Sequence, residues 1–104
     1  METEKFVEKL LNEGLELLSS EKKQKQKKGF ATLRAAFGLG SMTAAYYEGI
    51  CYKNGIGTYQ SDEQAFERLE MAADAVPKAM FELGLCYVHG IGTEQNLEKA
   101  FCVF

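Results

Sequence analysis

The sequence has no apolar run long enough to cross a membrane, and its first residues lack the basic and then apolar pattern of a secretory signal. Residues 1–4 read Met-Glu-Thr-Glu, which is acidic. A composition of 46% hydrophobic and 26% charged residues argues against disorder. We therefore expect a folded, cytoplasmic chain with no membrane partner.

Cysteine and histidine are also scarce, with three cysteines and one histidine in 104 residues. An odd number of cysteines would leave one unpaired in an oxidising compartment, so reduced thiols in a cytosol-like setting fit better. No nucleophile has an evident base, and no carboxylate pair indicates a catalytic pocket. The sequence therefore predicts that the protein is not an enzyme.

An eight-residue stretch recurs in the chain at a spacing of 35 residues. Residues 51–58 read Cys-Tyr-Lys-Asn-Gly-Ile-Gly-Thr, and residues 86–93 read Cys-Tyr-Val-His-Gly-Ile-Gly-Thr. A period in this range is typical of a solenoid, whose units cannot bury a core alone. The same register relates Ala44 to Ala79, Tyr46 to Phe81, Gly49 to Gly84, Gln60 to Gln95, Glu63 to Glu98, Ala65 to Ala100 and Phe66 to Phe101.

A degenerate first copy precedes the two clear ones. Gly14 lies 35 residues before Gly49, but residues 19–23 read Ser-Ser-Glu-Lys-Lys where the later copies have Gly-Ile-Gly-Thr. Terminal repeats of solenoids are often atypical because one face meets water. We expect a single domain over residues 1–104, with repeats at about 3–40, 41–75 and 76–104, the last of them incomplete. Three further positions of the first copy, Phe30, Leu33 and Ala36, lie 36 residues before Phe66, Leu69 and Ala72.

Apolar residues at three- and four-residue steps predict six helices. The expected ranges are 4–18, 24–37, 42–54, 61–75 and 77–89, followed by a sixth helix of about ten residues from 97 onward. Consecutive helices should pair as antiparallel hairpins. The predicted fold class is all-α, a right-handed α-solenoid of about three antiparallel helix-turn-helix repeats with the last one truncated.

Several residues mark the expected helix ends. Gly55 should end the third helix, and Gly57 permits a second unusual backbone angle in the same turn. Ser61 and Gln64 form a capping-box pattern, in which the serine hydroxyl accepts from the third helical amide and the glutamine reaches back. Pro77 stands at a first helical position, where its missing amide hydrogen has no partner to lose.

Three glycines lie inside the expected helices, at Gly14, Gly49 and Gly84. Each costs about 1 kcal/mol relative to alanine, so a cost that recurs at one spacing indicates close packing against the partner helix. Small residues at Ala65 and Ala100 support that interpretation. We expect the space between successive layers to be filled by the aromatic residues Tyr52, Tyr87, Phe66 and Phe101.

These residues resemble the Sel-1-like repeat (SLR), a branch of the tetratricopeptide-like helical hairpins. Glu48 departs from the pattern, because leucine is usual at its position, and Ser61 and Asn96 replace aspartate while remaining N-cap formers. The resemblance implies an adaptor or scaffold that binds a protein or peptide partner. The third copy matches the family pattern at Ala79, Leu83, Gly84, Tyr87, Gly90, Gly92, Lys99 and Ala100, and the second at Ala44, Gly49, Tyr52, Gly55, Gly57, Ala65, Ala72 and Ala73.

Two chemical alternatives are weaker. Cys51, Cys86 and His89 could face a metal ion, but cysteines at equivalent repeat positions are more commonly small buried hydrophobes. His89 occupies the position of Asn54, where either side chain can cap a helix end. The glycine-rich turn at 55–57 lacks the Lys-Ser/Thr of a phosphate-binding loop. We therefore expect no catalytic, cofactor-binding or metal-binding residues and no cofactor.

The first helices of stacked hairpins line the concave side of a solenoid. If the mid-helix glycines face the partner helices, an apolar stripe with polar flanks should face the groove and suit a peptide with apolar anchors. Some of these residues could instead belong to the core between repeats, especially Leu15, Ile50 and Leu85. The predicted partner-binding residues are Leu11, Leu15, Tyr46, Ile50, Lys53, Asn54, Phe81, Leu85, Val88 and His89.

Two other functions stay open. Val103 and Phe104 would leave an apolar end exposed, so the chain could be a fragment of a longer array or could form a homo-oligomer through that end. Five lysines within residues 22–28 could bind a polyanion weakly, although no aromatic residues interleave to stack on bases, so a nucleic-acid partner is not expected. These lysines are Lys22, Lys23, Lys25, Lys27 and Lys28.

Overall fold

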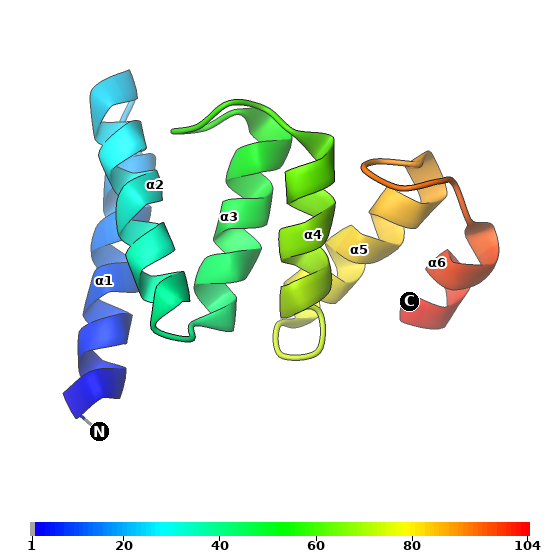
Figure 1. Cartoon of the computed structure of the whole chain (residues 1–104), viewed down its shortest axis with the longest axis horizontal. Helices are drawn as coiled ribbons and strands as arrows, with labels where there is room; N and C mark the ends of the chain where they lie inside the picture. Colours follow the sequence, from blue (N-terminus) through cyan, green and yellow to red (C-terminus); the bar gives the residue numbers. More distant parts are fainter. Residues whose placement is uncertain (1) are drawn as a thin grey trace.

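The computed structural model describes residues 2–104, which form six helices and, within that range, no strand. Successive helices pair as three antiparallel hairpins that follow one another across the molecule (Figure 1). The predicted all-α solenoid is confirmed. The helices are α1 (Glu2–Leu18), α2 (Lys23–Gly38), α3 (Met42–Asn54), α4 (Asp62–Ala72), α5 (Pro77–His89) and α6 (Leu97–Val103).

Helices α3 and α5 begin and end at the predicted residues, whereas α4 and α6 are shorter than expected. The α4 helix ends at Ala72 because the amides of Ala75 and Val76 both bond the Ala72 carbonyl and turn the chain toward α5. The α6 helix has 7 residues rather than about ten. The third hairpin therefore presents a shorter second helix than its neighbour does.

The N-termini of three helices carry the side-chain caps that satisfy otherwise unpaired amides. Ser41 accepts from Ala44 at 3.1 Å, Ser61 from Gln64 at 3.3 Å and Asn96 from Lys99 at 3.0 Å. The second half of the predicted capping box is wrong, because the Ser61 amide instead donates to the Tyr52 carbonyl at 2.8 Å. An equivalent bond joins Asn96 to Tyr87 at 2.8 Å. Both loops are thus folded back onto the end of the preceding helix.

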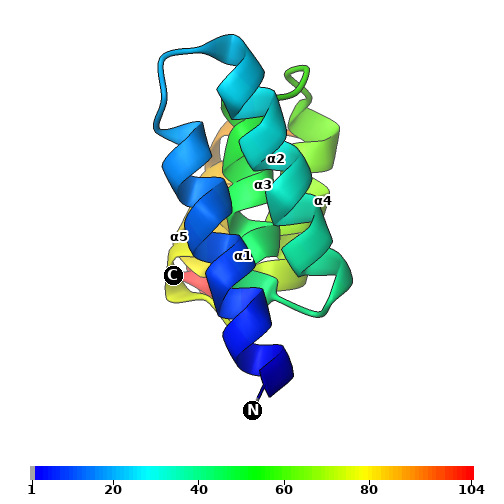
Figure 2. The same ribbon diagram turned by 90° about the vertical axis from the view of Figure 1, so that its left-hand side faces the viewer.

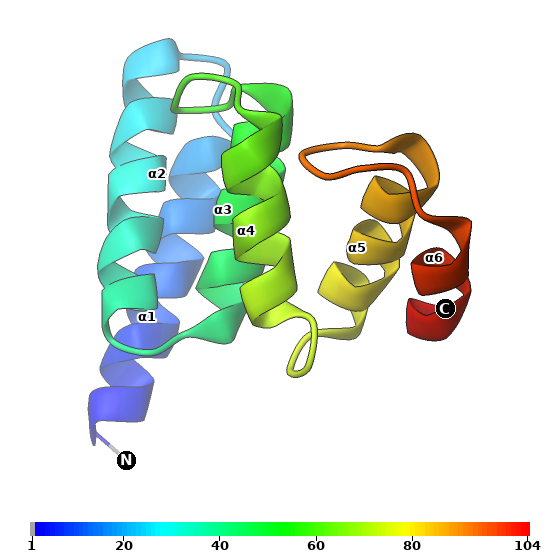
Figure 3. The same ribbon diagram turned by 45° about the vertical axis from the view of Figure 1, so that its right-hand side comes forward.

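The three hairpins stack in chain order, with α2 against α3 and α4 against α5. The result is a flattened array of 40 × 33 × 17 Å, with the N-terminal end of the described chain at one side and the C-terminal end at the other (Figure 1). Viewed from the first hairpin, α1 and α2 lie in front of the later helices (Figure 2). In Figure 3, α5 and α6 lie at the far edge of this array, with α4 between them and the first hairpin. Among the described residues, the second hairpin has a neighbouring hairpin on both sides, and the first and third have one on a single side.

Small residues and aromatic rings hold the layers together as predicted, with one exception. A Cβ at Gly49 would lie 2.9 Å from Leu69 Cγ on α4, and one at Gly14 would lie 3.1 Å from a methyl of Leu33 on α2. Between hairpins, edge-to-face ring pairs join Phe30 to Tyr52 and Phe66 to Tyr87, with centroids 5.2 and 5.6 Å apart.

Phe101 is the exception to the predicted packing between layers. Its side chain is 80% exposed, because the described chain supplies no hairpin beyond α6 to cover it. The prediction that Phe101 fills a space between layers is wrong for this chain, although its equivalents Phe30 and Phe66 both pack in that way.

Candidate functional site

The first helices of the second and third hairpins come together at an ion pair. Lys53 on α3 donates through Nζ to Glu82 Oε2 on α5 at 3.1 Å, and both side chains are partly buried. Tyr46 lies on α3 two turns before Lys53, and burial, reinforced by the Glu82 carboxylate, raises the pKa of its phenol. Tyr46 therefore stays protonated and available as a hydrogen-bond donor.

Beside this ion pair lies a shallow hollow that is centred on Phe81. Tyr46 and Glu82 line it together with Pro77 and Lys78 at the start of α5. The Phe81 ring is 56% exposed, so it stands at the rim without being part of the core. The arrangement offers two aromatic surfaces with charges of both signs around them, which suits a peptide with an apolar anchor.

A second hollow, with a volume of about 400 Å³, adjoins the first at Phe81. It is lined by Phe81 itself, by Met80 and by the end of the chain, where the Phe104 ring lies 5.8 Å from the Phe81 ring. The remaining lining residues are Ala73, Asp74, Ala75, Pro77 and Val103. Pro77 and Phe81 thus line both hollows.

The other predicted groove residues divide into two groups. Asn54 and His89 are exposed at the ends of α3 and α5, each directly before a left-handed glycine. Four of the apolar residues pack against core clusters and so contribute to the core as well as to any groove: Leu11 and Leu15 on the first cluster, Ile50 on the second and Val88 on the third. Leu85 is half-buried. Of the three remaining predicted residues, Tyr46 and Phe81 line one hollow, and Lys53 is paired with Glu82 of its lining. Tyr46 also packs against the second core cluster.

The sequence reasoning missed the role of Glu82, Pro77 and Lys78 in the hollow. Glu82 corresponds in the repeat to Tyr47, and Lys53 corresponds to Val88, so the ion pair has no counterpart in another repeat. A search by periodicity could not find it for that reason. The one signal available in the sequence was that these three residues lie within about one helical turn of Phe81.

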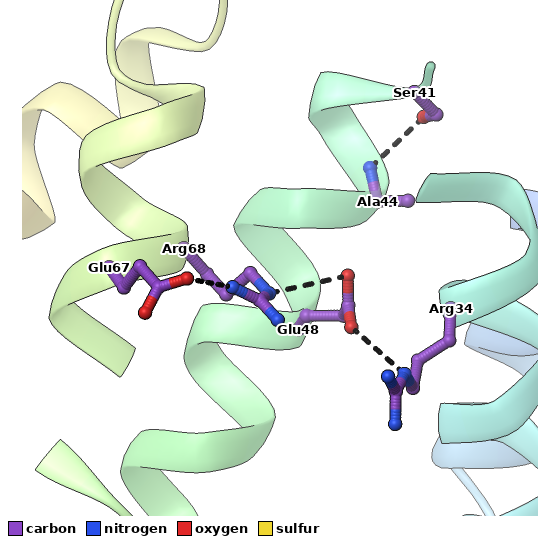
Figure 4. A network of polar contacts seen from close by, with 6 residues as sticks. All are labelled: Arg34, Ser41, Ala44, Glu48, Glu67 and Arg68. Atoms are coloured by element: carbon purple, nitrogen blue, oxygen red, sulfur yellow. Dashed lines mark hydrogen bonds and ion pairs between the residues drawn. The ribbon is translucent and has the colours of Figure 1, made fainter. Parts of the chain in front are cut away.

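Glu48 forms a buried charged cluster that the sequence indicated only as a departure from leucine. Its side chain is fully buried on α3, between Arg34 of α2 and Arg68 of α4, each 3.9 Å from a carboxylate oxygen (Figure 4). Arg68 also donates to Glu67 at 2.7 Å and lies over the ring of Phe37 at 5.3 Å. The cluster thus connects the first hairpin to both helices of the second.

The cluster joins three helices, but burying the Glu48 carboxylate in it is electrostatically unfavourable. Neither carboxylate oxygen of Glu48 has a hydrogen-bond partner in the part of the chain that the structure describes. Burial raises the pKa of the Glu48 carboxyl, and the two arginines oppose that rise only in part. The equivalent residue of the third hairpin is Leu83, which is buried without any such cost.

The residues of the metal alternative do not come together. Cys51 and Cys86 are buried, and burial raises the pKa of both thiols, that of Cys51 to about 12. His89 is exposed at the end of α5. Over residues 2–104, no three side chains of histidine, cysteine, aspartate or glutamate are placed to hold a metal ion. Both thiols are therefore protonated and have the character of small apolar side chains.

The lysine-rich segment is exposed and lies where the α1–α2 turn enters α2. The residue before the helix, Lys22, makes no side-chain cap, and the first turn of α2 carries no acidic residue. Positive charge at a helix N-terminus is unfavourable, because the amides there already carry partial positive charge. All five lysines are exposed to solvent.

The model of the Sel1 repeat matches residues 33–75 and 77–101, and the chain belongs to this family. Proteins with this fold generally serve as scaffolds for protein interaction and are generally non-catalytic. None of the curated proteins matches the chain. Among residues 2–104, no helix has the length and apolar character needed to cross a membrane.

Two solved structures are similar over 93% of this chain. One is c5321, a protective antigen of uropathogenic Escherichia coli strains with an SLR fold, at a TM-score of 0.89 and 23% identity. The other is a Sel1 repeat protein from Oxalobacter formigenes, at 0.77 and 25%. The matched region spans 21% and 29% of those chains, so the likeness shows the shared fold of a small part of each.

Proposed function

We propose that this chain is a non-enzymatic adaptor or scaffold that holds a protein or peptide on the face formed by α1, α3 and α5. One observation carries the proposal: Tyr46 and Phe81, at equivalent repeat positions, line the same hollow. Phe81 is more than half exposed, so its ring is accessible to a partner, and with Tyr46 it forms part of one apolar surface.

The ion pair beside the hollow supports this proposal. The bond between Lys53 and Glu82 joins α3 of the second hairpin to α5 of the third, and so favours one arrangement of the two helices beside the hollow. A preorganised groove loses less conformational entropy on binding than a mobile one. Lys78, which lines the hollow and is not part of this ion pair, offers a positive charge to an acidic residue of the partner.

The experiment compares single substitutions at Tyr46 and Phe81 with one on a second helix. In an affinity capture from native lysate, F81A and Y46A should lose a protein that the natural chain retains. Because Phe81 is exposed, F81A should also leave the melting temperature within about 2 °C of the natural value. M71A on α4 removes a side chain that is 46% exposed and should retain the protein.

The outcome for stability decides between groove and core. A large fall in melting temperature for F81A would assign Phe81 to the core and contradict the proposal. Equal capture by the natural chain, Y46A and F81A would also contradict the proposal.

Weak polyanion binding through residues 22–28 stays a lesser candidate, supported by the exposed lysines at the uncapped start of α2. It requires retention on a polyanion column that falls steeply as salt is raised. The three free cysteines suit the cytoplasmic setting that we propose for the chain.

A further inference from the structure

The lysine-rich start of α2 meets a loop of the next hairpin. The loop between α3 and α4 reaches across to α2 (Figure 1), and Gly57 in it lies so close to Gln26 that a Cβ would collide with the Gln26 carbonyl oxygen. Gly57 also has a positive φ of 74°, which side chains disfavour. This close contact fixes the position of the loop on the start of α2.

The contact places a tyrosine beside the lysines. Lys23, Lys27 and Tyr59 line one hollow of about 330 Å³, together with Gln26 and Gly57. Residues 22–28 contain no aromatic residue of their own, so the ring comes from a different hairpin. The fold thus combines at one place two kinds of side chain that are separate in the sequence.

The Tyr59 ring is supported from one side and is still open to a ligand. It meets the Tyr52 ring edge to face, with centroids 5.8 Å apart and an interplanar angle of 61°. Tyr52 is buried between the first two hairpins, where its ring also meets that of Phe30. Tyr59 nevertheless stays 68% exposed. An exposed ring of this kind can stack on a flat group of a ligand.

The lysines of residues 22–28 do not serve the stability of α2. Positive charge at a helix N-terminus is unfavourable, and the five ammonium groups form no ion pair with other residues in the range 2–104. The one acidic residue next to them is Glu21. Their charge is therefore available to an anionic ligand, although the whole chain has a net charge of −3.

The equivalent place between the second and third hairpins has the opposite charge. A loop glycine lies on a helix carbonyl there in the same way, but exposed glutamates replace a lysine and the tyrosine. The stacking of the layers thus requires the glycine and not the side chains around it. The matched residues are Gly57 and Gly92, Gln26 and Asp62, Lys27 and Glu63, and Tyr59 and Glu94.

We propose that the hollow of Lys23, Lys27 and Tyr59 binds single-stranded nucleic acid, with a base stacked on Tyr59 and the adjoining phosphates on the lysines. Lys23 and Lys27 lie one turn apart on α2, about 6 Å along its axis, so both can contact one backbone. A single strand offers phosphates together with unpaired bases, whereas a duplex keeps its bases stacked and an acidic protein segment has none.

This inference gives the lesser candidate function, polyanion binding, a ligand class and a second binding element. It does not depend on the groove formed by α1, α3 and α5, because the hollow around Phe81 shares no residue with this one.

The first test measures fluorescence anisotropy of a labelled oligouridine of about ten nucleotides, at about 50 mM salt. Y59A should weaken binding about tenfold because it removes the stacked ring. Y59F keeps the ring and should bind as the natural chain does. Glu94 at the equivalent position shows that the loop does not require tyrosine, so Y59A should stay folded.

The second test measures how the affinity falls with salt. The double variant K23Q/K27Q should make the logarithmic slope less steep by about 1.4, since each phosphate contact contributes about 0.7. The control K5Q/K9Q removes the same charge from exposed lysines at the opposite end of the first hairpin and should leave the slope unchanged. F81A should bind the oligouridine normally, which separates this proposal from the groove.

Several outcomes would overturn the proposal. They are no binding of the oligouridine by the natural chain, equal binding by Y59A, equal binding of duplex RNA, and an equal change of slope in K5Q/K9Q. Tighter binding of an oligoglutamate of the same length would assign the hollow to an acidic protein segment instead. Tyr59-dependent binding to phosphatidylserine vesicles, without binding of the oligouridine, would assign it to a membrane surface.

Discussion

The second and third hairpins share one sequence pattern, and two of the equivalent positions at which they differ show how enclosure changes the role of a residue. Where α3 buries Glu48 between two arginines, α5 buries Leu83. Where Leu69 on α4 is fully buried against Gly49, Phe104 at the end of α6 lies on Gly84 and is 61% exposed. The second hairpin is enclosed on both sides, and the third is covered on one.

Residues at equivalent repeat positions have different roles in the two hairpins because their neighbours differ. Arg34 and Arg68, which face Glu48, correspond to Glu70 and Val103 one repeat later. A carboxylate is tolerated in the second hairpin because guanidinium groups approach from both sides, and the third hairpin offers no such group at those positions.

The largest effect is expected from L83E, which places a second carboxylate at this position. With valine and glutamate at the positions of the two arginines, L83E should lower the free energy of unfolding by about 4 kcal/mol, as an uncompensated buried charge does. Urea denaturation measures the change. The control is L83Q, which has the same shape without the charge and should cost less. Equal losses for the two variants would show that charge is not the cause.

A smaller effect is expected where the two hairpins differ in enclosure. L69A removes a fully buried side chain that packs on Gly49 and should cost about 3 kcal/mol. The matched variant F104A removes a larger but mostly exposed side chain and should cost less than about 1 kcal/mol. Both values come from the same denaturation experiment. A loss from F104A as large as that from L69A would contradict the enclosure argument.

The smallest effect concerns the pH dependence of Glu48. Burial raises the pKa of the Glu48 carboxyl above its usual value of 4.5, so between that value and the raised one the folded chain binds more protons than the unfolded chain. The contribution of Glu48 to stability is therefore greatest at acid pH and is lost as pH rises through the raised pKa. E48Q lacks this loss.

The measurement is the free energy of unfolding of both chains as a function of pH. The stability of E48Q relative to the natural chain should increase as pH rises from about 4.5. A difference that decreases over that interval would mean that the arginines outweigh burial and lower the pKa. A constant difference would mean that Glu48 does not titrate there.

The helices and turns were predictable because their signals are local. Pro77 and Gly90 mark the two ends of α5, and Ser61 and Asn96 each cap a helix within the turn that follows. The mid-helix glycines were predictable as well, since a destabilising residue that recurs at one spacing must serve packing. Tyr46 and Phe81, two of the predicted groove residues, occupy equivalent repeat positions and line one hollow.

The remaining features depend on residues that do not repeat. The pair of Lys53 and Glu82 joins positions occupied by Val88 and Tyr47 in the other copies, so no periodicity marks it. The partners of Glu48 come from the preceding hairpin and from its own second helix, and only the stacking of the layers brings them within 3.9 Å.

The amino-acid sequence by itself determined the repeat, the helices and the glycine turns, because each depends on residues within a turn or two of one another. Tertiary structure alone decided which members of an equivalent set are enclosed. Phe66 and Phe101 have the same local sequence context and opposite exposure, since burial depends on the surface that a neighbouring hairpin supplies. The same physical cause makes Glu48 a buried cluster in one layer and leaves the outer side of α6 open.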